Sequence, residues 1–250
     1  MLSALWLAAL IVGADPPADA EANADDFRAP SSWSAMGKDL WYDKANKRLA
    51  MRSVVALREG SLEHLLCRRN TKEHEAVLAT EASPKLIKAG LLLLGVAEGK
   101  PVQFDPKFSA PSGGKVKIEV EWIDNGKTKK ALAKEWVKDI QDKPLTLDWV
   151  FAGSSFYTDP ITQKQYFGAD DGDLITVANF PTAILDLPIA SSESDASRGF
   201  MANTEKIPPQ GTRVTIYLSA LGKPVSAPAA SPKSKVEKTE KATAPAPARD

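Results

Sequence analysis

The sequence predicts an α+β fold, a mostly antiparallel β-sheet with one main helix, at about residues 83–95, packed on it. Three observations carry this prediction. Short segments with alternating apolar and polar residues recur through the middle of the chain, and turn residues separate them. Only one stretch shows a clear helical period. With 43% hydrophobic residues in 250, the chain has enough apolar material for a core of its own.

The first predicted elements are three strands. Residues 48–58 alternate in part and indicate a strand. Residues 62–68 and 73–80 indicate two more, and the polar residues 69–71 between them favour a hairpin. In a hairpin these two strands would run antiparallel.

The predicted helix follows directly. Ser83 is a good N-cap, Pro84 suits the first helical position, and Gly95 is placed to end the helix. One face carries an apolar stripe that would cover the sheet, formed by Leu86, Ile87, Leu91 and Leu94.

The second half of the domain reads as further strands. Residues 115–123 alternate cleanly, and Asp124-Asn125-Gly126 predicts a tight turn into a returning strand that ends near Ala133. Residues 134–140 fit either a helical turn or more strand. The remaining predicted strands cover 145–152, 165–169, 173–178 and 213–219. Asp170-Asp171-Gly172 predicts a hairpin between the second and third of these four.

The ends of the chain differ from its middle. Residues 1–14 read as a signal peptide, because Leu2–Val12 is apolar, uncharged and followed by small residues that allow cleavage after Ala14. No basic residue precedes the apolar run, which suggests a start codon further upstream. Residues 15–30 read as a disordered acidic linker, 31–220 as one domain, and 221–250 as a disordered tail rich in Pro, Ala and Lys. The expected location is therefore the periplasm or the extracellular space.

Composition excludes several classes of function. Formal net charge is zero, with 32 basic and 32 acidic side chains, so the basic excess typical of nucleic-acid binders is missing. A single cysteine, Cys67, forms no intramolecular disulfide and no four-cysteine metal site. No apolar stretch of the sequence is long enough to span a bilayer, and no cofactor is predicted.

Several separated segments together resemble one family. These are residues 57–80, 91–95, 149–154 and 203–211, which occur in the same order as in the YdjY-type domain family. The resemblance covers most of residues 40–220 and implies a single exported domain, without an activity to transfer. Some relatives are associated with ferredoxin-type cysteine clusters. This chain departs from them, because one cysteine does not hold such a cluster.

Both histidines and the only cysteine of the chain lie within residues 63–75. Cys, His and Glu side chains are ligands of transition metals, and a Cys–His pair can also act as nucleophile and base. The candidate ligand or metal residues are Cys67, His74, Glu75, His64 and Lys72. The alternative is a solvated hairpin face. On a strand, His64 and Cys67 would point to opposite sides, whereas Cys67 and His74 could meet across a hairpin.

Other polar groups give weaker indications of a functional site. Asp170, Asp171 and Asp173 surround Gly172, but they lack the spacing of a calcium loop, so no calcium site is predicted. The leading interpretation is an uncharacterised, non-enzymatic, extracytoplasmic binding or interaction module. The alternative is a metal-binding or redox-linked accessory protein that uses the Cys/His cluster. The partner stays open between an envelope protein and a small ligand, with nucleic acid excluded.

Overall fold

The computed structural model describes residues 29–189 and 199–222 and corrects the predicted fold class. The fold is mostly β, built around a closed barrel of eight strands, with one short α-helix. An α+β sheet with a main helix packed on it is therefore wrong. In order around the barrel, the strands are β3 (Arg48–Val55), β16 (Arg213–Leu221), β7 (Lys115–Asp124), β10 (Trp149–Phe151), β14 (Leu185–Asp186), β13 (Asp173–Thr176), β5 (His64–Arg68) and β6 (Ala76–Thr80).

The barrel closes because β6 returns to pair with β3. Val54 lies opposite Ala79 and Val55 opposite Leu78 in this antiparallel pair. Because β3 and β6 pair over these residues, neither strand is left there as a free edge of the sheet. Local sequence patterns do not reveal this pairing. The sequence did not predict this closure, because it depends on pairing between strands that the turn signals do not connect.

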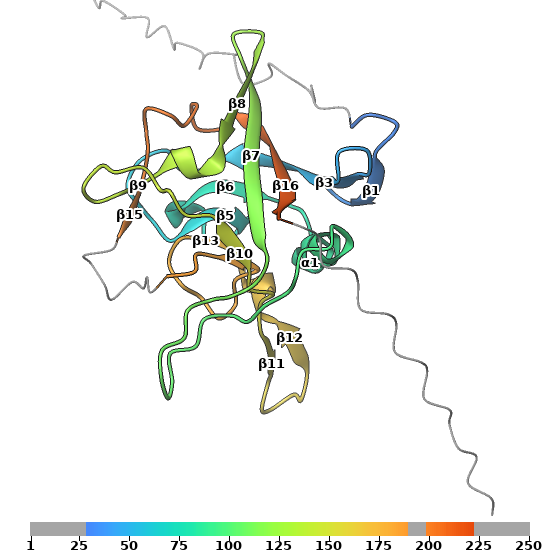
Figure 1. Cartoon of the computed structure of the whole chain (residues 1–250), viewed down its shortest axis with the longest axis vertical. Coiled ribbons are helices and arrows are strands. Elements are labelled where there is room, and N and C mark those ends of the chain that lie inside the picture. Colours follow the sequence, from blue (N-terminus) through green and yellow to red (C-terminus); the bar gives the residue numbers. More distant parts are fainter. Residues whose placement is uncertain (1–28, 190–198, 223–250) are drawn as a thin grey trace, which may run out of the picture.

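The longest ladders of the barrel surround its last strand. β16 lies between β3 and β7 and is antiparallel to both (Figure 1). The alternation predicted for residues 115–123 holds, since Val116, Ile118 and Val120 are buried while neighbouring positions on β7 are more exposed. These side chains belong to one continuous core that includes Trp149.

The predicted hairpin of residues 62–80 is wrong. β5 and β6 are parallel, with His64 opposite Ala76 and Cys67 opposite Ala79. Between them the chain returns through residues 69–75, which include the 3₁₀ helix η2 (Glu73–Glu75). The polar turn residues therefore begin a return crossing, and β6 takes its antiparallel partner from β3.

The predicted hairpin at Asp170-Asp171-Gly172 is also wrong. β12 (Gln165–Phe167) pairs with β11 (Phe156–Thr158) in a separate two-stranded sheet. β13 pairs with β5 and β14 instead. The turn residues belong to the 3₁₀ helix η4 (Gly168–Asp171), which Gly172 ends with a positive φ of 119°.

Peripheral strands extend the barrel. β1 (Ser34–Gly37) and β2 (Leu40–Asp43) continue from β3, and β8 (Lys127–Leu132) pairs with β7 through the Asn125-Gly126 turn, as predicted. A three-stranded sheet contains β4 (Ser61–Leu62), β15 (Phe200–Ala202) and β9 (Val137–Asp139). The 3₁₀ helix η3 (Ala133–Trp136) precedes β9. Residues 134–140 thus contain both alternatives that their sequence allowed.

The helix α1 (Pro84–Leu93) forms where the sequence predicts it, with Ser83 as N-cap residue and Pro84 in the first turn. It contacts β1, β2 and η4 at the side of the barrel (Figure 1). Gly90 allows the helix to approach Leu49 on β3 closely, because a Cβ at position 90 would lie 2.6 Å from Leu49 Cδ1. Within the described ranges, no helix has the length and apolar character to cross a membrane. The predicted signal peptide, almost all of the linker and nearly the whole tail lie outside the described residues.

Candidate functional site

A polar cluster forms where β5, the return segment 69–75 and β13 meet. His64 starts β5 and is fully buried. Asp173 starts β13, the neighbouring strand of the barrel, and is also buried. His64 Nε2 lies 2.7 Å from Asp173 Oδ1. The barrel thus joins two polar side chains that are 109 positions apart in the sequence.

Asp173 receives two further hydrogen bonds. Lys72 Nζ donates to Asp173 Oδ1 at 2.6 Å, and the hydroxyl of Thr182 donates to Asp173 Oδ2. Burial works against ionisation of Asp173, but the hydrogen bonds from His64, Lys72 and Thr182 outweigh it and lower its pKa to about 2. Asp173 is therefore an anion at neutral pH.

The charge on Asp173 fixes the role of each nitrogen of His64. An ionised carboxylate only accepts hydrogen bonds, so Nε2 must carry a proton and donate it. In the neutral imidazole the lone pair then belongs to Nδ1. Nδ1 is buried and has no hydrogen-bond partner within the described parts of the chain. A buried polar atom of this kind needs an explanation.

The carboxylates of Glu63 and Glu75 lie near the His64 ring. Glu75 Oε1 is 3.9 Å from His64 Nδ1, too far for a hydrogen bond. Glu63 is adjacent to His64 in the chain, and its backbone N–H donates to the Glu75 carbonyl at 3.1 Å. One ligand atom from each of Glu63, His64 and Glu75 lies within 4.8 Å of the others, which is a group that could hold a metal ion.

The ring of His64 is also held from its face. Phe180 stacks on it with 5.2 Å between ring centroids and 24° between ring planes. Lys72 Nζ lies 4.9 Å from the Phe180 centroid, so the ammonium contacts both the aromatic ring and Asp173. The plane of the imidazole, and with it the direction of Nδ1, is thereby fixed.

The structure separates the five residues singled out from the sequence. His64, Lys72 and Glu75 converge on the cluster. His74 has a side chain 76% exposed and lies 3.7 Å from Glu75 through Nε2. Cys67 is buried between Ala76 and Ala79, and burial raises the pKa of its thiol to about 11. At neutral pH this thiol stays protonated, which suits neither a nucleophile nor a metal ligand.

Sequence reasoning missed three members of the cluster. Thr182 and Phe180 lie in the connection between β13 and β14, which carries no motif. Asp173 was weighed only as part of a calcium loop with Asp170 and Asp171. Its neighbour Gly172 marks a turn, but nothing local shows that β13 pairs with β5.

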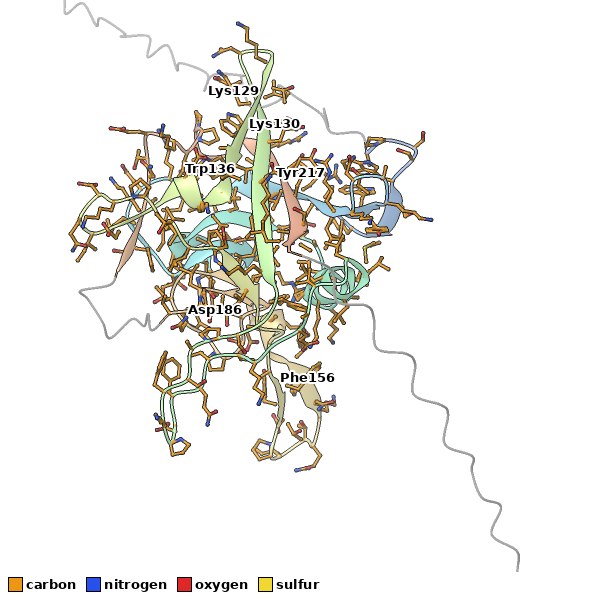
Figure 2. The ribbon with its side chains drawn as sticks, in the orientation of Figure 1. Lys129, Lys130, Trp136, Phe156, Asp186 and Tyr217 are labelled. Carbon is orange, nitrogen blue, oxygen red and sulfur yellow. The ribbon has the colours of Figure 1, made fainter. Side chains whose placement is uncertain are left out.

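A second buried carboxyl group lies on the next strand. Asp186 Oδ1 accepts hydrogen bonds from the Thr176 hydroxyl at 2.9 Å, the Asn179 amide at 3.1 Å and the Leu187 backbone N–H at 2.8 Å. Its Oδ2 has no hydrogen-bond partner among the residues that the structure describes. Burial is the main influence and raises the pKa of Asp186 to about 7. Figure 2 shows Asp186 within the body of the molecule.

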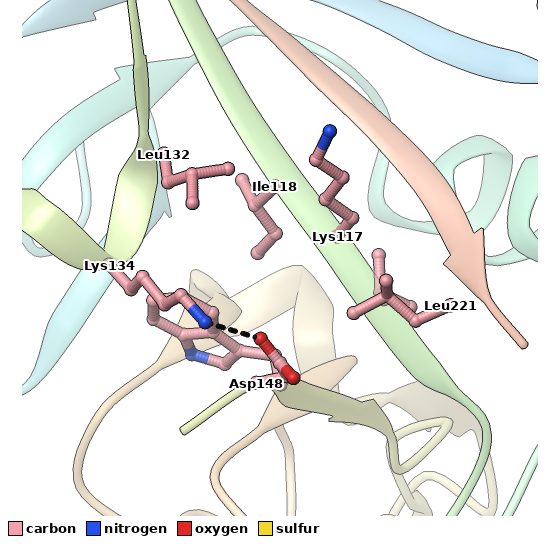
Figure 3. Close-up of a pocket in the computed structure, with 8 residues that line it drawn as sticks. Lys117, Ile118, Leu132, Lys134, Asp148 and Leu221 are labelled. Atoms are coloured by element: carbon pink, nitrogen blue, oxygen red, sulfur yellow. Dashed lines mark hydrogen bonds and ion pairs between the residues drawn. The ribbon is translucent and has the colours of Figure 1, made fainter. Parts of the chain in front are cut away.

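Two hollows of the surface are lined by other residues. A notch of about 220 Å³ opens where β7 passes from pairing with β8 to pairing with β10, and the ion pair of Lys134 and Asp148, 2.8 Å apart, crosses it (Figure 3). A broader groove of about 1230 Å³ follows the outside of β3, β16 and β7. Several of its charged side chains are paired, as Arg52 is with Asp39 and Arg69 with Glu81. Neither hollow contains a residue of the His64 cluster.

These features define a class of protein: a closed, mostly antiparallel β-barrel domain with a buried histidine–carboxylate cluster at one junction of strands. Within this class, the chain belongs to the YdjY domain family, whose domain matches residues 40–219. The match confirms the resemblance seen in the sequence, covers seven of the barrel strands completely and reaches to residue 219 of the eighth, β16. No curated protein and no solved structure matches the chain.

Proposed function

We propose that this domain is a metal-binding module that holds a divalent transition-metal ion, Zn²⁺ being the best fit, between His64, Glu63 and Glu75. One observation carries the proposal. The buried Nδ1 of His64 lacks a hydrogen-bond partner within the described chain and faces carboxylates, while Asp173 holds the opposite nitrogen. A metal-binding histidine typically donates its second ring N–H to a carboxylate in this way.

The spacing of the ligand atoms supports a shared ion. Zinc binds imidazole nitrogen and carboxylate oxygen at about 2.0–2.2 Å, so two ligands of one ion lie at most about 4.2 Å apart. The 3.9 Å from His64 Nδ1 to Glu75 Oε1 falls within this limit. A cation also relieves the repulsion between the neighbouring carboxylates of Glu63 and Glu75.

The kind of ligand favours a transition metal. Calcium and magnesium prefer oxygen ligands alone, whereas an imidazole with carboxylates suits zinc and its neighbours in the periodic table. Three protein ligands would leave at least one coordination position for water or a ligand from solution. The proposed role takes up the metal-binding alternative weighed from the sequence, with His64 and Glu75 but without Cys67, and no reaction is proposed.

Metal stoichiometry tests the proposal. The protein, purified without chelator or stripped and reloaded with Zn²⁺, is expected to hold one ion per chain by elemental analysis. Glu75→Gln and His64→Gln should lose it, because each removes a ligand. His74→Ala is the matched control, since that histidine is the neighbour of Glu75 but is exposed.

A second variant guards against simple unfolding of His64→Gln. Asp173→Asn keeps an acceptor near Nε2 but removes the negative charge, and it is expected to weaken zinc binding by about 10- to 100-fold. Circular dichroism checks that each variant remains folded. Metal-free protein at saturating Zn²⁺, or loss of the ion from His74→Ala alone, would overturn the proposal.

We also propose that the protein is exported. The support lies in the sequence alone, in the apolar run Leu2–Val12 and the small residues up to Ala14. Expression of the full chain with a C-terminal tag, followed by fractionation and N-terminal sequencing, should yield a mature chain that starts at Asp15. A cytosolic protein that retains Met1 would contradict this location.

A further inference from the structure

Large apolar side chains are exposed on two projections at one end of the barrel. The first finger is the loop of residues 100–112, and the second finger is the β11–β12 hairpin with its flanking residues, 155–168. Both extend from the end of the molecule opposite the tip of the β7–β8 hairpin (Figure 1). The exposed apolar residues of the two fingers are Phe104, Phe108, Phe156, Tyr157, Ile161 and Tyr166.

The first finger has internal structure. Gln103 and Ser109 exchange two backbone hydrogen bonds, of 3.0 and 2.8 Å. Phe104 and Phe108 therefore lie on the same short loop, with 6.1 Å between their ring centroids. Two aromatic side chains are thus presented together beyond the barrel.

The second finger is held along its whole length. At its tip, Asp159 accepts hydrogen bonds from the backbone N–H groups of Ile161 and Thr162, at 2.8 and 2.7 Å. This turn presents Ile161 with 91% of its surface exposed. Along the strands, Tyr157 and Tyr166 stack with centroids 5.4 Å apart.

The base of the second finger is anchored to the helix. Lys88 Nζ, on α1, donates to the Gly153 carbonyl at 2.9 Å and lies 5.4 Å from the centroid of Phe156. Figure 2 shows Phe156 at this base. The apolar tip is therefore a fixed feature of the fold, and its exposure calls for a partner.

Charge favours one kind of partner. Lys100, Lys107 and Lys164 are exposed on the fingers. The acidic residues there are Asp105 and Asp159, so the fingers carry three positive and two negative charges, and the Asp159 carboxylate is bonded to the backbone of the turn at Ile161. Aromatic and isoleucine side chains flanked by lysines are the composition that enters the interface of an anionic bilayer.

We propose that the two fingers dock this domain on an anionic lipid bilayer, with Ile161, Phe104 and Phe108 inserted at the interface. Shape favours a bilayer over a protein partner. A stable protein interface buries about 800 Å² on each side in complementary contact. The fingers project separately from the barrel (Figure 1). A fluid bilayer can accept two separate projections without a matching shape.

Site-specific labelling tests this contact. Cys67 is buried with a raised pKa, so a cysteine introduced by Ile161→Cys can be labelled selectively with an environment-sensitive fluorophore. Vesicles of phosphatidylcholine with phosphatidylglycerol are expected to increase its emission severalfold. The matched control is Ile123→Cys, near the tip of the β7–β8 hairpin and so at the end of the molecule opposite the fingers. Ile123 is 53% exposed, and the emission of a label there should stay unchanged. Both labels are placed in the full chain. Binding through the apolar N-terminus alone would not bring position 161 into the bilayer, so only insertion of the fingers predicts a difference between positions 161 and 123.

Binding strength gives the second readout. Without a label, Ile161→Asp should weaken co-sedimentation of the full chain with these vesicles by about tenfold or more, because burial of an isoleucine is worth at least that factor. Ile123→Asp should change it little. Equal emission changes at positions 161 and 123, or none at 161, would overturn the proposal. So would an Ile161→Asp variant whose only effect is to dissociate oligomers.

Discussion

Two buried aspartates of the same barrel face opposite electrostatic surroundings. Asp173 and Asp186 lie on the adjacent strands β13 and β14, and both are shielded from solvent. The donors to Asp173 include an ammonium and an imidazole, and its pKa falls to about 2. The donors to Asp186 are a hydroxyl, an amide and a backbone N–H, and its pKa rises to about 7.

The difference shows that burial alone does not set the charge of a carboxyl group. Burial raises the pKa of both groups. Hydrogen bonds lower both, but only at Asp173, where the donors are His64, the Lys72 ammonium and Thr182, do they outweigh desolvation. Asp173 is therefore suited to orient a histidine, whereas Asp186 stays close to its titration point near neutral pH.

The largest expected effect comes from removing the charged partner at Asp173. Asp173→Leu leaves the N–H of His64, the ammonium of Lys72 and the hydroxyl of Thr182 without their acceptor. Breaking a buried ion pair in this way costs about 3–5 kcal/mol of unfolding free energy. Urea unfolding of the metal-free protein, followed by circular dichroism, measures the loss. A loss no greater than that of Asp186→Leu would contradict the distinction between the two sites.

The next effect concerns the pH dependence of Asp186. Because its pKa is raised in the fold, the unfolded chain releases this proton first, from about pH 4, and the folded chain releases it near pH 7. Between these values the group lowers the stability of the wild type as pH rises, by at most about 1.4 kcal/mol per pH unit.

Asp186→Asn keeps an oxygen acceptor and removes this titration. Its stability relative to the wild type should therefore increase from pH 4 to pH 7 and stay level above, as measured by thermal or urea unfolding. Asp124→Asn, at an exposed turn, is the control for a changed net charge. A constant difference between variant and wild type across this range would show that Asp186 does not titrate there.

The smallest effect tests the neutral donors. Thr176→Val removes one hydrogen bond to Asp186 Oδ1 and should cost about 1 kcal/mol. Because that bond favours the ionised form, its loss should also move the titration of Asp186 to higher pH. An infrared or NMR titration of the carboxyl group reads this shift directly. A shift to lower pH would mean that the hydroxyl stabilises the protonated form.

Local patterns predicted those parts of the molecule that local interactions form. The Asn125-Gly126 hairpin, the alternation of β7 and the helix that begins after Ser83 follow from the residues of each segment. The parallel pairing of β5 with β6 and the closure of β6 onto β3 depend on strands brought together from a distance. A polar turn such as residues 69–71 does not reveal whether the next strand pairs with the preceding one in antiparallel or in parallel orientation.

The candidate site divides in the same way. His64, Lys72 and Glu75 were visible because histidine, lysine and glutamate cluster in one short segment. Asp173 was not, because its contact with His64 exists only through the pairing of β13 with β5. His74 and Cys67 share the segment but not the cluster, since one points to solvent and the other packs among alanines.

The position of β16 constrains how the protein can be made. This strand comes last in the folded domain, yet it fills the space between β3 and β7. Until residues 213–221 have left the ribosome, both neighbours lack a partner along most of one edge. The barrel therefore cannot close before this strand is available, and a message truncated before it would yield an open sheet with unpaired edges instead of a smaller working domain.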